Sequence, residues 1–285
     1  MKKGLIILFV SFISCKKELN HKTITAVSII ATEQQSLINP TGKTIKTRFN
    51  TPEGFNRIRP IENSFQYYLQ NFNLKPQGSR VHLYNQELKN RQDVHEAILN
   101  INVGNRDLQQ CADATMRLRA EYLYQEQLFH NIHFNFTNGF NAAYSKWRQG
   151  ERIRVKGNTV TWYKGAKKGD SRKSFDKYLT MVFSYAGTLS LEKEMKKVTL
   201  KDMQIGDIFI QGGSPGHAVI VVDMAINKER ETLFLLAQSY MPAQEIHILK
   251  NFNNPSISPW YSAKNLSNLT TPEWTFTKNN LKRFQ

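Results

Sequence analysis

The sequence predicts an α+β domain, in which a cysteine-bearing helix precedes a set of short strands. A helix is expected from about Leu108, because Ala, Met, Leu, Arg, Glu and Gln dominate the residues around and after Cys111. Two apolar runs, 208–210 and 218–222, are too short for helices and contain the β-branched residues typical of strands. A glycine-rich segment separates them and indicates a tight turn, so the two strands are expected to pair.

One histidine opens the second of these strands. His217 follows Gly212, Gly213, Pro215 and Gly216, which punctuate the turn. A side chain placed where a turn enters a buried strand is held rigidly and can still face a cleft, as a general base must. The position therefore favours His217 as a general base, and a structural histidine is the alternative.

The helix that carries Cys111 has a recognisable start. Asp107 and Gln110 have the spacing of a capping box, with Asp in place of Ser or Thr. With Asp107 as the N-cap, Cys111 lies in the first helical turn, where the macrodipole and free N–H groups favour an anion. We expect these groups and His217 to lower the pKa of the thiol below about 8.5, the value of a free cysteine. Because the thiolate is the reactive form, Cys111 is the candidate nucleophile, and a small core residue is the alternative.

The order of these features resembles the NlpC-type cell-wall peptidases, which belong to the papain-like cysteine hydrolases. The shared features are a cysteine at a helix start, a Gly-Asp-apolar strand, Gly-His opening the next strand, and a polar residue in the following strand, here 233–239. The resemblance implies a papain-like fold with insertions, in which the nucleophile helix packs on an antiparallel sheet. It also implies Cys111 as nucleophile, His217 as base and Gln238 as the residue that orients the imidazole.

Supporting roles follow from the same resemblance. The backbone N–H of Cys111, with Gln109 or Gln110, would supply the oxyanion site. For Gln238 the alternative is a buried amide that satisfies backbone groups. Asp223, which follows the second apolar run, is expected to be a solvated turn residue.

Nearly the whole chain from about Asn39 onward also resembles a bacterial lipoprotein family known by a domain of unknown function, number 4846. The segments that carry this resemblance are 108–122, 203–223 and 237–244.

The N-terminus resembles a lipoprotein export signal. Lys2 and Lys3 form a basic region, residues 5–12 form an apolar region too short to span a bilayer, and Phe-Ile-Ser-Cys at 12–15 resembles a processing site. The sequence thus predicts a signal peptide at 1–14 and a lipidated Cys15. A plain signal peptide with an incidental cysteine is the alternative.

This interpretation divides the chain into three parts: the signal peptide 1–14, a polar tether 15–38 and a single domain 39–285. The protein is expected in the bacterial cell envelope, lipid-anchored outside the cytoplasm through Cys15. The two cysteines then have separate roles and no disulfide is expected. An unpaired Cys111 in an exported chain is itself a sign of a reactive thiol.

Charge indicates the class of partner. The formal net charge is +16, and removing residues 1–14 takes away two lysines and leaves +14. Such an excess favours peptidoglycan, another anionic envelope polymer or an anionic lipid surface as a partner. The sequence lacks a basic helix, zinc-ligand spacing or an aromatic RNA-binding motif, so no nucleic acid partner is expected. The charges are interpreted as scattered, and a merely solvated surface is the alternative.

An insertion at about 125–200 is expected to recognise the substrate. It contains a hairpin candidate at 152–163 with a Gly-Asn turn, and a helix candidate at 174–186. His130 and His133 lack a third ligand at suitable spacing, so no metal site is expected. Nearer the N-terminus, 44–49, 81–84 and 97–103 are interpreted as strands and 64–72 as a short helix.

The sequence therefore predicts an exported, lipid-anchored cysteine hydrolase that cleaves an amide bond in peptidoglycan stem peptides without a cofactor. Two alternatives stay open. The same residues would also support an acyltransferase or a lipid deacylase. A catalytically silent lipoprotein that binds envelope components would use none of this chemistry.

Overall fold

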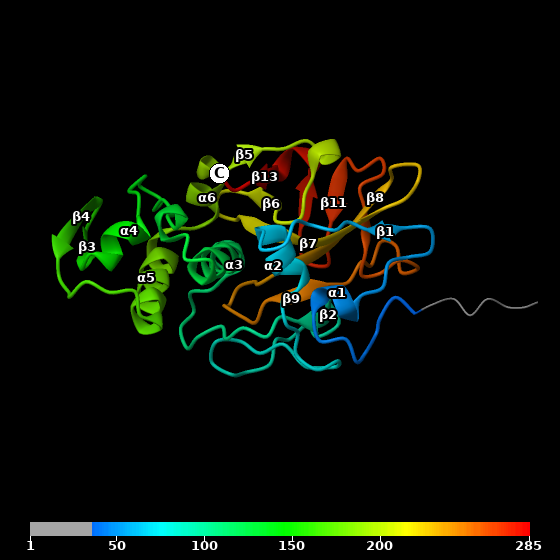
Figure 1. Cartoon of the computed structure of the whole chain (residues 1–285), viewed down its shortest axis with the longest axis horizontal. Helices are drawn as coiled ribbons and strands as arrows, with labels where there is room; N and C mark the ends of the chain where they lie inside the picture. The colour runs from blue at the N-terminus through cyan, green and yellow to red at the C-terminus, as the bar shows by residue number, and fades with distance from the viewer. Residues whose placement is uncertain (1–35) are drawn as a thin grey trace, which may run out of the picture. The chain divides into compact units, whose positions relative to one another are not determined.

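A nine-stranded antiparallel sheet organises the described part of the chain, residues 36–285, in the computed structural model (Figure 1). Its strands, in spatial order, are β2 (His95–Ile98), β9 (His247–Leu249), β8 (Thr232–Gln238), β7 (His217–Ile226), β6 (Ile208–Gln211), β13 (Leu281–Arg283) and β5 (Lys196–Lys197). Two short strands, β1 (Asn56–Arg57) and β10 (Tyr261–Ser262), pair with β7 and β8. Two hairpins stand outside this sheet: β3 (Glu151–Lys156) with β4 (Thr159–Lys164), and β11 (Asn268–Thr270) with β12 (Thr275–Thr277).

The helices of the described residues vary in length. They are α1 (Ile45–Arg48), α2 (Phe65–Gln70), α3 (Cys111–Gln125), α4 (Tyr144–Arg148), α5 (Arg172–Tyr185) and α6 (Thr188–Glu194). Single 3-10 turns occur at η1 (Phe129–Asn131), η2 (Leu200–Asp202) and η3 (Lys278–Asn280). Among the described residues, 36–285, none of the helices has the length and apolar character needed to cross a membrane.

Strands β6, β7 and β8 form the centre of the core. The apolar runs expected at 208–210 and 218–222 lie in β6 and β7, which pair in antiparallel register with Ile208 opposite Ile220. Helix α3 packs against β7 and β8, and its Met116 and Leu118 are fully buried. The α+β class and an antiparallel sheet covered by the Cys111 helix are therefore confirmed.

The segment between α3 and α6 forms a separate cluster beside the sheet. Figure 1 shows α4, α5 and the β3–β4 hairpin together on the far side of α3 from β7 and β8. Its core is aromatic: the rings of Tyr124 and Phe175 stack with centroids 4.2 Å apart, and Tyr144 and Tyr178 pack at 4.9 Å. The expected hairpin and helix in this segment are both confirmed.

Two local predictions are wrong, and a third is right only in part. The 44–49 segment forms α1 and not a strand, because the Thr44 hydroxyl accepts a hydrogen bond from Thr47 N and caps a helical turn. The 81–84 segment makes only isolated bridges, and the 97–103 segment contributes only the end of β2. For the 81–84 and 97–103 segments, the pairing partners that the chain reaches in three dimensions override weak alternation.

The expected signal peptide 1–14 and Cys15 lie outside the described residues, as does most of the tether.

Candidate active site

Helix α3 begins at Cys111 itself, so the cysteine does lie in the first turn. The cap differs from the expected one: Gln110 is the N-cap, and its backbone N–H donates to Asp113 Oδ2 at 3.2 Å. Asp107 instead accepts from the Gln110 side chain at 3.1 Å and from Ala243 N at 2.7 Å. Asp107 therefore links the start of α3 to the segment after β8, and the prediction that it caps the helix is wrong.

The Cys111 thiol is buried at the wall of a cavity of about 310 Å³. The other residues of this wall come from the start of α3, the α5–α6 connection and the turn between β6 and β7, with Met241 at the rim. This cavity gives a small ligand access to the sulfur. A larger cavity, of about 970 Å³, is lined by residues such as Lys197 and Lys278 and by none of the predicted site residues.

The prediction of a lowered thiol pKa is wrong in this structure. Burial, and after it the neighbouring Asp113, raise the pKa of Cys111 to about 11. The backbone N–H groups of Ala218, Ala112 and Cys111 oppose this rise. Because the Ala218 N–H is hydrogen-bonded to Cys111, the sulfur lies beside Ala218, the residue that follows His217. The helix start thus does supply N–H groups to the sulfur, but desolvation outweighs them.

His217 and Gln238 meet at one end of the central strands. His217 is the first residue of β7 and Gln238 the last of β8, and neighbouring antiparallel strands bring those ends together. The imidazole Nε2 and Gln238 Oε1 are 2.8 Å apart, and both side chains are buried. Burial, helped by the positive charge of Lys89, lowers the pKa of His217 to about 4, while Gln238 opposes this. The imidazole is therefore neutral near pH 7.

The hydrogen-bond partners of Gln238 determine which nitrogen of His217 carries the proton. Gln238 Nε2 lies 2.6 Å from Glu273 Oε2, and a carboxylate can only accept. The amide oxygen of Gln238 must then face His217 and accept from its Nε2–H. On the other side, His247 Nδ1 lies 2.9 Å from the Glu245 carbonyl, so His247 Nε2 is free to face the Gln238 amide at 3.4 Å. His217 Nδ1 is consequently left as the nitrogen with a free lone pair.

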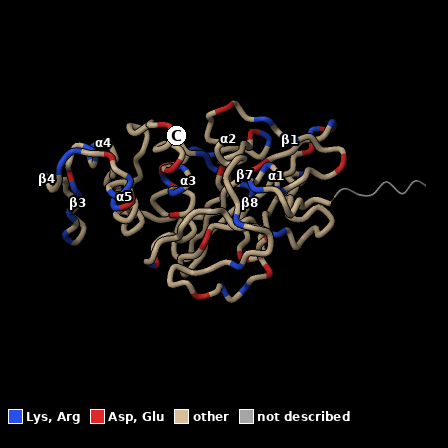
Figure 2. The backbone as a smooth tube through the Cα atoms, turned by 60° about the horizontal axis from the view of Figure 1, so that its bottom comes forward, with Lys and Arg blue, Asp and Glu red and all other residues tan. Residues whose placement is uncertain are grey.

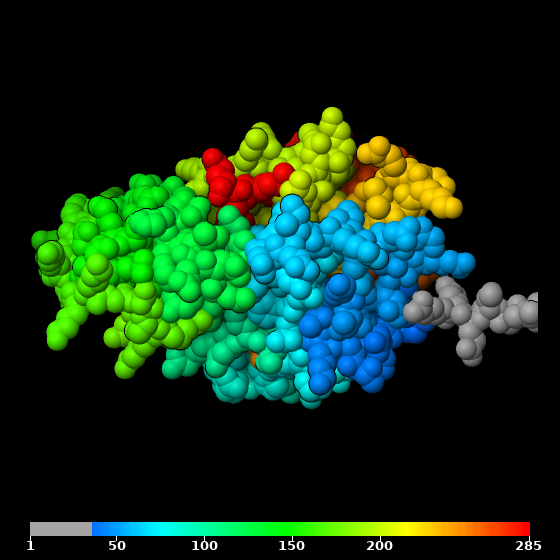
Figure 3. Space-filling view, in the orientation of Figure 1, coloured from blue at the N-terminus to red at the C-terminus, as the bar shows by residue number. Residues whose placement is uncertain are grey.

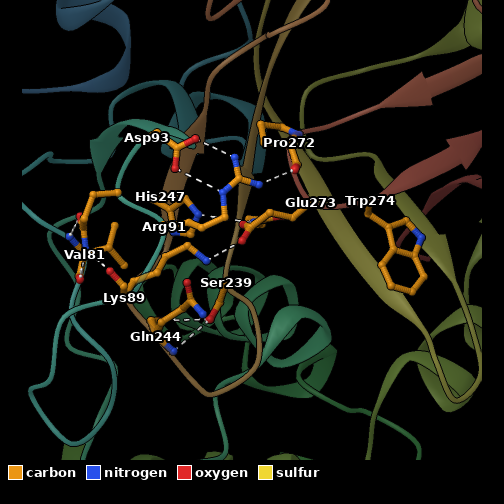
Figure 4. A network of polar contacts seen from close by, with 12 residues as sticks. Val81, Lys89, Arg91, Asp93, Ser239, Gln244, His247, Pro272, Glu273 and Trp274 are labelled. Atoms are coloured by element: carbon orange, nitrogen blue, oxygen red, sulfur yellow. Dashed lines mark hydrogen bonds and ion pairs between the residues drawn. The ribbon is translucent and has the colours of Figure 1, made fainter.

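An ion pair holds Glu273 in place. Lys89 Nζ lies 2.7 Å from Glu273 Oε1, and both side chains are less than a tenth exposed. Figure 4 shows Lys89, Glu273 and His247 converging, with Arg91 bound to Asp93 and the Pro272 carbonyl at the edge of the group. Sequence reasoning missed Lys89 and Glu273, because residues 184 positions apart carry no local signal of their pairing.

Aromatic rings enclose the imidazole. The ring centroids of Tyr240, Trp274 and Phe276 lie 5.0, 5.3 and 5.8 Å from that of His217. The aromatic residues of the C-terminal segment therefore pack over the candidate base, which explains its strong desolvation.

The structure separates the two glutamines expected at an oxyanion site. Gln110 lines the same cavity as Cys111. The Gln109 side chain instead borders a second cavity, of about 580 Å³, where its Oε1 lies 3.3 Å from Arg117 Nη1 and its buried Nε2 has no partner. The Gln109 backbone carbonyl accepts from the Ser239 hydroxyl at 2.9 Å and so ties the start of α3 to the end of β8.

Asp223 is a correction. It is fully buried within β7, where Arg57 Nε lies 3.0 Å from one carboxylate oxygen and Gln70 Nε2 donates to the other at 2.6 Å. Burial raises the pKa of Asp223 to about 6, although Arg57 and Gln70 act in the opposite direction. The strand continues to Ile226 and does not end at Asp223, which is why the prediction of a solvated turn is wrong.

Metal-ligating side chains do not gather in groups of three anywhere in residues 36–285. His133 has one acidic neighbour, Glu194, with 4.0 Å between His133 Nδ1 and Glu194 Oε2. Around His217 the polar groups are the Gln238 amide, the His247 imidazole and the Lys89–Glu273 ion pair.

Comparison with known proteins identifies one family. Searches of curated proteins and of solved structures give no match. The family described as domain of unknown function 4846 matches residues 45–283, which include Cys111, His217, Gln238 and Glu273. Since the match spans most of the 285 residues, the chain belongs to the family of domain of unknown function 4846.

Proposed function

We propose that this protein is a cysteine hydrolase that cleaves an amide bond in peptidoglycan stem peptides. The observation that carries the proposal is the meeting of three elements. The Cys111 sulfur lies beside the Ala218 N–H at a cavity wall, and His217, the residue that precedes Ala218 in the chain, lies 2.8 Å from Gln238. The nucleophile helix on an antiparallel sheet, and the chain order Cys, His, Gln, support a papain-like relationship.

The residues suggest a general-base mechanism. His217 Nδ1 takes the proton of the Cys111 thiol while the sulfur attacks the carbonyl carbon of the substrate. The backbone N–H of Cys111, at the N-terminus of α3, stabilises the oxyanion, and Gln110, which lines the same cavity, would assist. His217 then donates the proton to the leaving amine, and the amide C–N bond breaks. Water, deprotonated by His217, hydrolyses the thioester and regenerates the thiol.

The raised pKa of Cys111 makes the base essential. With a pKa of about 11, the free thiolate at pH 7 would be about four powers of ten less abundant than the thiol, a cost of roughly 5 kcal/mol. If the proton moves to His217 while the sulfur attacks, no free Cys111 thiolate has to form beforehand. Such a mechanism predicts that His217 is as indispensable as Cys111.

An envelope location completes the proposal. The lipidated Cys15 would hold the domain at a membrane surface, outside the cytoplasm and within reach of the cell wall. Acyl transfer or lipid deacylation would use the same residues with a different acceptor or ester.

A second candidate function has its own support. The buried Cys111 with a raised pKa also suits a catalytically silent envelope-binding lipoprotein, in which the cysteine only fills space.

Purified peptidoglycan separates these candidates. The wild-type protein should release peptide fragments that mass spectrometry detects, while Cys111→Ala and His217→Ala should release none. Cys111→Ala differs by one buried sulfur, so circular dichroism should show that it folds. Absence of fragments with the wild type, together with no labelling of Cys111 by iodoacetamide even on prolonged incubation at pH 9, where about one thiol in a hundred is ionised, would favour the silent lipoprotein.

A further inference from the structure

The positive charge of this protein is concentrated and not scattered. Residues 144–177, named here the basic lobe, comprise α4, the β3–β4 hairpin and the start of α5. They contain eleven Lys and Arg but three Asp and Glu, a formal excess of eight, which is half of the chain's +16. Figure 2 shows Lys and Arg gathered along these elements. The interpretation of scattered charge in the sequence is therefore wrong.

Most of this charge is not neutralised within the fold. Arg148 pairs with Asp170 at 2.6 Å, and Arg172 pairs with Glu121 and Asp176. In contrast, six lysines of the lobe are exposed and have no acidic partner among the described residues. They are Lys156, Lys164, Lys167, Lys168, Lys173 and Lys177. An unpaired cluster of this size concentrates anions at the surface and accelerates their association.

Five basic side chains of the lobe lie over aromatic rings, and two of them lie over rings of the β3–β4 hairpin. Lys146 Nζ is 5.6 Å from the centroid of Trp162, and the Arg154 guanidinium is 4.5 Å from that of Tyr163. These contacts hold the cations on the hairpin without consuming their charge. The hairpin thus presents fixed positive charges, which cost less ordering on binding than free lysines do.

The lobe is connected to the Cys111 cavity through α5. Arg172 begins this helix, and Phe183 near its end lines the cavity. At 1.5 Å per residue the two positions lie roughly 17 Å apart along the helix. Figure 3 shows the surface of this part of the chain, in green, adjoining the rest of the described unit. A chain held on the lobe could therefore reach the sulfur over the length of about five extended residues.

We propose that the basic lobe binds a flexible polymer that carries carboxylate groups. A bilayer is disfavoured because Tyr163 is the one large hydrophobic residue that the lobe exposes. Helices or hairpins that insert into a membrane interface need a wide apolar face beside their lysines. The proposal stands apart from the hydrolase proposal, since polymer binding needs neither Cys111 nor His217.

Poly-L-glutamate, labelled with a fluorophore, is the probe for this surface. Fluorescence anisotropy at 50 to 300 mM NaCl should show binding by the wild type that weakens steeply with salt. A triple variant, Lys164→Gln, Lys167→Gln and Lys168→Gln, should bind at least tenfold more weakly at 50 mM salt. Its log–log salt slope should be smaller by roughly two, since each lost charge contact removes about 0.7 from the slope for a flexible strand.

A matched control removes the same charge elsewhere. Lys43→Gln, Lys228→Gln and Lys278→Gln replace three exposed lysines outside the lobe and should bind like the wild type. All six positions are exposed, so both triple variants should fold. Cys111→Ala should bind the polymer as the wild type does, whether or not the protein hydrolyses anything.

Three results would overturn the proposal. Equal weakening in both triple variants would mean that net charge alone attracts the polymer. Binding to vesicles containing phosphatidylglycerol but not to poly-L-glutamate would make a membrane the partner of the lobe. No binding to either at 50 mM NaCl would leave the lobe as a solvated surface.

Discussion

Replacing Glu273 by Gln tests the hydrogen bonds that orient His217. In the wild type, Glu273 accepts from both Lys89 and Gln238, at 2.7 and 2.6 Å. A glutamine has one acceptor and one donor end. Because the Lys89 ammonium can only donate, it should hold the oxygen of the introduced glutamine, and the new NH₂ group should face Gln238. Gln238 must then turn its own oxygen toward residue 273 and its NH₂ toward His217.

This reversal moves the proton on the imidazole. Nε2 of His217 would have to accept, the proton would shift to Nδ1, and the lone pair that receives the thiol proton would be lost. The alternative is to keep Gln238 in place against a facing NH₂, which loses a charge-assisted hydrogen bond. The difference between a charged and a neutral hydrogen bond is about 1–2 kcal/mol. Glu273→Gln should therefore lower kcat/KM roughly 5–30-fold through kcat.

A second substitution should restore activity. Met is close to Lys in length and suits the buried position near the Tyr240 ring, which lies 5.3 Å from Lys89 Nζ. In the double variant Lys89→Met, Glu273→Gln, no cation holds the oxygen of the introduced glutamine. Its amide can then rotate and accept from Gln238 again. We expect kcat to recover to within about threefold of the wild type, because the remaining loss is one charge on a hydrogen bond.

Two measurements check this reasoning. Fragment release from peptidoglycan gives kcat for the three proteins, and long-range ¹⁵N–¹H NMR of the histidines reports the tautomer of His217 without any substrate. The single variant should show protonated Nδ1, and the wild type and double variant protonated Nε2. If Glu273 has only a structural role, kcat of the double variant should be no higher than kcat of Glu273→Gln. Full activity in Glu273→Gln, with Nε2 still protonated, would refute the proton assignment.

Three further predictions concern titration. Iodoacetamide alkylation of wild-type Cys111 should rise with pH and inflect above 8.5, since burial raises the thiol pKa to about 11; an inflection below 8.5 would show a stabilised thiolate. Asp113→Asn removes a negative charge that raises the pKa of Cys111, so the inflection should move to lower pH. Below the pKa, each unit of this shift speeds alkylation about tenfold. An unchanged profile would mean that Asp113 carries no charge there. His217 has its pKa lowered in the folded state to about 4, so its neutral form stabilises the fold above the unfolded pKa of about 6.5 and this contribution disappears as pH falls toward 4. Urea unfolding of His217→Gln should then lose less stability between pH 6.5 and 4, by about 3 kcal/mol at most; parallel curves would contradict the linkage.

Local sequence patterns predicted the elements that carry the proposed chemistry. The β-branched run before Asp223 is unambiguous for a strand, and the composition after Leu108 is unambiguous for a helix. The Gly-Asn turn at 157–158 likewise predicted the β3–β4 hairpin, whose register pairs Lys156 with Thr159. Each of these patterns lies within a stretch of fewer than twenty residues. Several positions in each stretch favour the same element, so the prediction does not depend on a single residue.

The parts that could not be predicted depend on long-range contacts. Asp223 is buried because Gln70, 153 residues earlier, and Arg57 reach it across β7. Glu273 is fixed by Lys89 in the same way. Burial of a charge is tolerated only with such partners, and neither partner is visible from its own neighbourhood. The concentration of charge in residues 144–177 is different, since counting along the sequence would have found it.

The pKa values of Cys111 and His217 indicate that both side chains are uncharged at neutral pH before a substrate binds. At pH 7 the proton resides on the sulfur, because the thiol has a pKa of about 11 and the imidazole one of about 4. Moving it to His217 would cost about 10 kcal/mol for isolated groups, whereas attraction between two unit charges about 4 Å apart returns only roughly 4 kcal/mol at an effective dielectric of 20. An ion pair is therefore scarce before substrate arrives. Under the proposed mechanism the thiolate would form only as it attacks a carbonyl, so the correct tautomer of His217 would be the main requirement for reactivity.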